Sequence, residues 1–104
     1  MSTAHKVATR GELEPGSAKC VQAGNCAIAL YNVNGEFYAT QDECSHAEAS
    51  LSDGWLEDYE ITCPLHGAAF DVRTGKPLGL PATKPVPTYP VRVEGDDIYV
   101  ELEF

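Results

Sequence analysis

The stretch that decides the fold lies at residues 27–40 and reads AIALYNVNGEFYAT. Its first half, residues 27–33, is almost continuously apolar, which predicts a well-buried strand. Asn34-Gly35 follows, and this pair favours a two-residue hairpin turn in which both central residues have positive φ. Residues 36–40 then predict the returning strand. This part of the chain is therefore expected to form a β-hairpin with one strand in the protein interior.

Other short strand candidates are spread along the rest of the chain. Residues 90–94 and 97–102 alternate between apolar and polar side chains on either side of Gly95-Asp96, so they predict a second hairpin. Residues 7–9, 61–63 and 69–72 are further candidates, and only single helical turns near Leu13 and residues 47–49 are expected. Short strands separated by many turns favour an all-β sandwich or barrel.

A proline-rich segment runs from Pro77 to Pro90 and contains five prolines. Proline removes a backbone donor and fixes φ. The segment is therefore expected to be a stiff extended connector and not a strand of a sheet.

The size and charge of the chain limit its possible functions. A length of 104 residues predicts one domain, and no apolar run approaches the roughly 20 residues of a membrane helix. The formal net charge of −9 disfavours nucleic acid and anionic membranes as partners and favours proteins with basic surfaces. The N-terminus shows no apolar signal segment, so the cytoplasm is the expected location.

Two short boxes carry the chemistry. Cys44-Ser45-His46 is followed after sixteen residues by Cys63-Pro64-Leu65-His66-Gly67, so each box offers one thiolate and one imidazole. These ligand types suit both zinc and iron–sulfur clusters. Structural zinc sites usually pair Cys with Cys and His with His. The Cys–His pairing seen twice here favours a two-iron cluster, with zinc remaining as the alternative.

The two boxes resemble the C-x-H and C-P-x-H-G boxes of Rieske proteins. Residues 51–54 (LSDG) and 70–75 (FDVRTG) resemble the Rieske ferredoxins of bacterial aromatic-ring dioxygenases in particular. The resemblance implies a Rieske fold, an antiparallel β-sandwich base with a small cluster-binding lobe. It implies a single domain over residues 1–104, with the lobe at about 42–70. It also implies one [2Fe–2S] cluster, and the ligands that it implies are Cys44, His46, Cys63 and His66.

The same resemblance implies a function. The chain would be a soluble, monomeric one-electron carrier that accepts electrons from a ferredoxin reductase using FAD and NAD(P)H and delivers them to a terminal Rieske oxygenase. Four protein ligands leave no open iron position, so the chain itself is not expected to be an enzyme. Two alternatives are a Rieske-like small subunit of another redox enzyme, such as nitrite reductase, and a structural zinc module.

The resemblance also bears on the reduction potential. High-potential Rieske proteins carry an extra cysteine in each box, together with a serine and a tyrosine that donate hydrogen bonds to the cluster sulfurs. The boxes here lack the extra cysteines, and Ala68 and Phe70 occupy the hydroxyl positions. Fewer donors predict a potential toward the low end of the Rieske range.

Residues outside the boxes are expected to have no ligand role. Cys20 and Cys26 have no histidine nearby and are expected to be unligated thiols. His5 is expected to be a solvated surface residue and Trp55 a packing residue. Glu57, Asp58 and Glu60 are expected to form a solvated face, with docking to a basic partner as the alternative.

Overall fold

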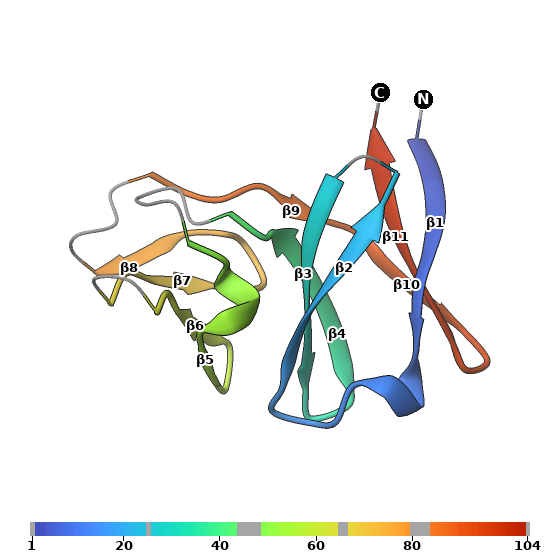
Figure 1. Ribbon diagram of the computed structural model, residues 1–104, viewed down its shortest axis with the longest axis horizontal. Helices are drawn as coiled ribbons and strands as arrows, with labels where there is room; N and C mark the ends of the chain where they lie inside the picture. Colours follow the sequence, from blue (N-terminus) through green and yellow to red (C-terminus); the bar gives the residue numbers. More distant parts are fainter. Residues whose placement is uncertain (1, 25, 44–48, 65–66, 80–83, 104) are drawn as a thin grey trace.

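The computed structural model describes residues 2–24, 26–43, 49–64, 67–79 and 84–103, which form three antiparallel sheets (Figure 1). In chain order the elements are β1 (Ser2–Thr9), η1 (Arg10–Glu12), β2 (Ala18–Ala23), β3 (Cys26–Val33), β4 (Glu36–Gln41), η2 (Leu51–Asp53), β5 (Trp55–Glu57), β6 (Glu60–Thr62), β7 (Ala69–Asp71), β8 (Pro77–Gly79), β9 (Thr88–Tyr89), β10 (Val91–Glu94) and β11 (Asp97–Glu103). The expected all-β class is confirmed.

Two of the sheets form the base. One has the strand order β1-β11-β10 and the other β2-β3-β4-β9. They pack face to face around a buried apolar cluster to which Ile28 and Leu30 contribute from β3, and Ile98 and Val100 from β11. The base is therefore an antiparallel β-sandwich, which is one of the two architectures, sandwich or barrel, that the strand pattern predicted.

Strand β3 is buried on both of its faces. Ile28 and Leu30 point into the base, whereas Ala29, Tyr31 and Val33 belong to a second apolar cluster on the opposite side. A strand in a middle layer must be apolar at successive positions, which explains the apolar run at residues 27–33. The turn after it has φ of 53° at Asn34 and 94° at Gly35, as predicted.

The third sheet forms a lobe beside the base, on the left in Figure 1, with the order β5-β6-β7-β8. Its inner face carries Ile61 and Phe70, which pack with Leu51 against Tyr31 of β3. The chain leaves the base after β4 and returns through β9. The two strands are neighbours, with Thr40 opposite Thr88.

The C-terminal hairpin also agrees with the prediction. Val93 lies opposite Ile98 and Glu94 opposite Asp97 around Gly95, whose φ is 62°. Strand β11 additionally pairs with β1, a contact between the two ends of the chain. The strand expected at residues 7–9 begins at Ser2 because this pairing with β11 extends it.

The proline-rich segment corrects one prediction. It was expected to contain no sheet strand, yet β8 begins at Pro77 and β9 lies at Thr88–Tyr89. Both strands are at the edge of their sheets, and proline is tolerated at the first residue of an edge strand. Residues 80–83, and the helical turn expected near residues 47–49 over most of its length, lie outside the described residues.

Two further strands, β2 and β5, were not predicted either, and the turn expected near Leu13 is the helix η1. Within the described ranges, no helix has the length and hydropathy of a membrane span.

Candidate metal centre

The first box lies in a loop whose two ends are held together. Glu43 and Ser50 form an isolated antiparallel bridge, and the Leu51 amide donates to the Asp42 carbonyl at 2.6 Å. The Asp42 carboxylate, which is nearly fully buried, also accepts from the Ser52 amide at 3.0 Å. Cys44 and His46 lie between these ends, outside the described residues.

The strand that leads into this loop is secured by buried hydroxyl groups. The Tyr31 hydroxyl lies 2.8 Å from Thr40 Oγ1, and Thr40 donates to the Gln41 carbonyl at 2.9 Å. Because the Thr40 hydrogen is used in this way, Tyr31 is the donor to Thr40. Burial raises the pKa of the Tyr31 phenol, so the group stays neutral.

The second box lies in a tight turn at the lobe. Cys63 is fully buried, and its amide donates to the Ala68 carbonyl at 2.6 Å. The turn passes through Gly67, whose φ of 73° is in the left-handed region that glycine tolerates. His66 precedes Gly67 in the sequence and is outside the described residues.

Residues next to both loops belong to the same buried apolar cluster. Leu51, just after the first loop, packs in one apolar cluster with Cys63 and Ala68, which begin and end the second. Two closed loops from one core, each carrying a cysteine and a histidine, suit a cofactor that bridges them. A buried thiol side chain at Cys63 fits the cysteine ligation of an iron–sulfur cluster.

The residues around the second box are apolar, as the sequence indicated. Ala68 and Phe70 are both fully buried and carry no hydroxyl. These two side chains therefore offer no hydrogen-bond donor to the cofactor. High-potential Rieske proteins, which this chain otherwise resembles, have hydroxyl residues at the two positions.

Gly54 is a residue that sequence reasoning missed. A Cβ at this position would overlap the carbonyl oxygen of Thr62, the residue before Cys63. Its φ is −84°, so glycine is needed here for space and not for backbone conformation. Its signal in the sequence is the LSDG segment at residues 51–54, which the resemblance singled out without giving the glycine a role.

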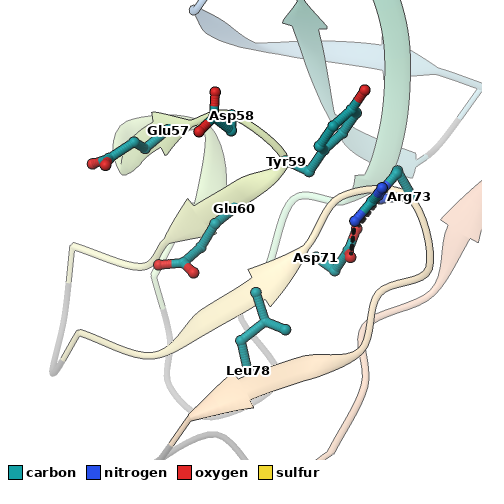
Figure 2. Close-up of a pocket in the computed structure, with 7 residues that line it drawn as sticks. All are labelled: Glu57, Asp58, Tyr59, Glu60, Asp71, Arg73 and Leu78. Carbon is teal, nitrogen blue, oxygen red and sulfur yellow. Dashed lines mark hydrogen bonds and ion pairs between the residues drawn. The ribbon is translucent and has the colours of Figure 1, made fainter.

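A chain of side chains joins the lobe to the base. Arg73 donates to both carboxylate oxygens of Asp71, at 3.0 and 2.9 Å, and its guanidinium lies 4.0 Å from the ring centre of Tyr59 (Figure 2). The Tyr59 ring meets Tyr38 of β4 edge to face, at 6.0 Å between centres. The hydrogen bond from Arg73 lowers the pKa of Asp71 and raises that of Arg73.

The predictions for the residues outside the two boxes have mixed outcomes. Cys20 and Cys26 are exposed and form no disulfide with each other. The pKa of Cys20 is raised, first because its thiol is partly desolvated and second because the charge of Asp42 is nearby. The prediction for Trp55 is wrong, because this side chain is 65% exposed. In the short strand β5 the residue that packs inward is its neighbour Leu56.

The prediction for His5 is also wrong. Its side chain is half-buried in β1, and its Nε2 is buried with no hydrogen-bond partner within the described part of the chain. The reason is the length of β1, which carries His5 past the β2–β3 hairpin, where a Cβ on Gly24 would lie 3.6 Å from the ring. The acidic residues at 57, 58 and 60 are exposed, as predicted.

Comparison with known proteins agrees with this architecture. The model of the Rieske [2Fe–2S] domain matches residues 3–90. The ferredoxin component of biphenyl 2,3-dioxygenase from Rhodococcus jostii (strain RHA1) is 50% identical over 98 residues, which cover 94% of this chain and 92% of that protein. The ferredoxin subunit of 3-phenylpropionate/cinnamic acid dioxygenase from Escherichia coli (strain K12) is 60% identical over 76 residues, 72% of each chain.

A solved structure of a complex between reduced oxygenase and oxidized ferredoxin in carbazole 1,9a-dioxygenase contains a similar chain. It is 41% identical, with a TM-score of 0.88, over 93% of this chain and 91% of that one. The family match, the related sequences and the similar fold are all consistent with the buried Cys63 and with the two loops whose ends are held together. The chain belongs to the Rieske [2Fe–2S] domain family, in which it is a ferredoxin, a one-electron carrier with one Rieske-type cluster and no catalytic role of its own.

Proposed function

We propose that Cys44, His46, Cys63 and His66 are the ligands of the cluster. The support is the closure of both loops: the Glu43–Ser50 bridge spans the first box, and the hydrogen bond from Cys63 to Ala68 spans the second. When bound, the cluster supplies one-electron redox chemistry. The protein holds it, and the apolar side chains beside Cys63 limit its access to water.

In this proposal, residues 1–104 form a single Rieske domain with the lobe inserted in the base. We take the lobe to begin near Asp42, the bound that the resemblance to Rieske proteins implies. We extend its end from residue 70 to Gly79, because β8 pairs with β7 in the same sheet. The protein would act as a monomer in the cytoplasm, and the exposed thiols of Cys20 and Cys26 suit a reducing compartment.

The partners in this proposal are two. A ferredoxin reductase that uses FAD and NAD(P)H donates one electron, and the terminal Rieske oxygenase of an aromatic-ring dioxygenase accepts it. The similarity to ferredoxins of biphenyl and phenylpropionate dioxygenases carries this assignment, and the carbazole dioxygenase complex supports an oxygenase as the acceptor. The absence of a hydroxyl from Ala68 and Phe70 favours a reduction potential toward the low end of the Rieske range, which spans roughly −150 to +300 mV.

The ligand set is tested by substitution and spectroscopy. Protein purified without oxygen and reduced with dithionite should give a rhombic EPR signal with an average g value below about 2. Cys63→Ser should abolish this signal, whereas the matched control Cys20→Ser should retain it. A colourless protein with one equivalent of zinc would contradict the proposal.

The partners are tested by turnover. NADH-dependent oxidation of an aromatic substrate, with a purified reductase and terminal oxygenase of a biphenyl dioxygenase system, should require this chain. Loss of turnover with Cys63→Ser, and its retention with Cys20→Ser, are the expected results. An intact cluster that is reduced by the reductase but never oxidised by the oxygenase would contradict the assigned acceptor.

A further inference from the structure

The outer face of the β5–β8 sheet has no layer packed against it among the described residues. In β5 and β6 the inward side chains are Leu56 and Ile61, which contact the buried cluster. The alternating side chains point the other way, with Trp55 in line with Thr62, and Glu57 in line with Glu60. This face is therefore open to a partner.

Large apolar side chains are exposed on this small sheet. Trp55 is 65% exposed and Leu78 46% exposed, and the one other large exposed apolar residue in the described ranges is Val93, in the base. Single exposed apolar residues are common on protein surfaces. Two on one four-stranded sheet, one of them a tryptophan, are more typical of an interaction site, since tryptophan is enriched at the centres of protein interfaces.

The charge around these side chains is negative. Glu57, Asp58 and Glu60 are exposed, and none of them forms an ion pair within the described residues. Arg73 pairs with Asp71, which lies directly opposite Glu60 in the β6–β7 pairing, and all three line the same pocket (Figure 2). Lys76 also acts on Asp71. Beyond the Asp71–Arg73 pair, the three carboxylates outnumber the cation Lys76, so the face is negative.

The face is close to the proposed cluster site along the chain. Trp55 lies directly opposite Thr62 in the β5–β6 pairing, and Thr62 is bonded to Cys63. Glu57 and Glu60 are the next opposing pair at the end of the same two strands. A protein bound over Trp55 would thus lie behind the buried cysteine of the second box.

We propose that Trp55, Leu78, Glu57, Asp58 and Glu60 form a docking surface, the acidic lobe face, for a protein that presents a basic patch around an apolar centre. Trp55 and Leu78 would supply the apolar contact, and the carboxylates would steer the partner by charge complementarity. The negative charge disfavours nucleic acid and anionic lipid on this face. That the partner is a redox protein rests on the proposed function; that the face binds a basic protein does not.

The test measures binding with no electron transfer. Mitochondrial cytochrome c, a small basic haem protein, serves as the probe, and calorimetry at low ionic strength gives its Kd for this chain with both proteins oxidised. The Glu57→Gln/Glu60→Gln double variant should raise Kd about fivefold. The matched control Glu36→Gln/Asp96→Asn makes the same change of charge at two exposed positions of the base, and it should change Kd less than twofold.

A second pair of variants tests the apolar contact. Trp55→Ala should raise Kd about tenfold, and Trp55→Phe, which keeps an aromatic ring, should raise it less. Equal effects of the two charge variants, or an unchanged Kd in Trp55→Ala, would overturn the proposed surface. A missing rhombic EPR signal would instead count against the proposed function, because the calorimetric result does not depend on it.

Discussion

The potential of the cluster should rise when hydroxyl groups are placed at positions 68 and 70. Ala68→Ser and Phe70→Tyr each add one hydroxyl at a side chain that is fully buried in the present structure. The Ala68 carbonyl accepts a hydrogen bond from the Cys63 amide at 2.6 Å, so residue 68 closes the segment that contains the second box. Phe70 packs in the same apolar cluster as Cys63. Water does not compete with donors placed at such buried positions.

The expected size follows from hydrogen-bond energetics. Hydrogen bonds to charged groups contribute about 1.5–3 kcal/mol, and we take about 1 kcal/mol of this as the preference of each hydroxyl for the reduced, more negative cluster. For a one-electron couple, about 1.4 kcal/mol corresponds to about 59 mV. Each substitution should therefore raise the potential by about 40 mV and the pair by about 80 mV.

Protein-film voltammetry measures the potential, and EPR of the reduced protein reports whether the cluster is intact. Ala68→Val is the control at the first position, because it adds volume without a donor and should not raise the potential. At the second position the wild-type phenylalanine is itself the control for tyrosine. An unchanged or lower potential in the double variant, with an intact EPR signal, would refute the reasoning.

Three other perturbations have defined outcomes. Since the pKa of Asp71 is lowered in the folded state, its carboxylate stabilises the protein at neutral pH, and this contribution is lost as the pH falls through that pKa. Asp71→Asn should therefore cost about 1 kcal/mol in urea unfolding at pH 7, and the difference from wild type should shrink below about pH 4; a constant difference would contradict this. Asn32, which is nearly fully buried, bonds one carbonyl and one amide at 2.7 and 2.8 Å, so Asn32→Ala should lower the free energy of unfolding by about 2–4 kcal/mol, and a loss below about 1 kcal/mol would contradict it. Gly54→Ala should displace Thr62 and reduce the iron content per protein, whereas the control Gly11→Ala, with no atom within 4 Å of the added Cβ, should leave it unchanged.

The sequence predicted the elements whose cause is local. The Asn34-Gly35 turn depends only on the φ preferences of two residues, and the alternation around Gly95 specifies its hairpin without help from the rest of the chain. The kind of site could also be predicted from local sequence, because each box contains one cysteine and one histidine within a few residues.

The features that were missed depend on distant pairing. Strand β8 begins at a proline and exists because Phe70 of β7 lies beside it. Trp55 was expected to be packed, and the pairing of β5 with β6 turns it outward while Leu56 turns inward. His5 is half-buried only because β1 runs the full length of β11. None of these arrangements can be derived from the neighbouring residues alone.

The placement of the lobe between β4 and β9 has a consequence for how such proteins can change. Thr40 and Thr88 are paired neighbours, so the chain departs for the lobe and comes back from it at adjacent strands, which lie about 4.8 Å apart in a sheet. A segment with its two ends so close can be lengthened, shortened or exchanged while the hydrogen bonds of the base remain in register. The lobe can thus vary as an insertion, because the sandwich is completed by the pairing of its own terminal strands, β1 and β11.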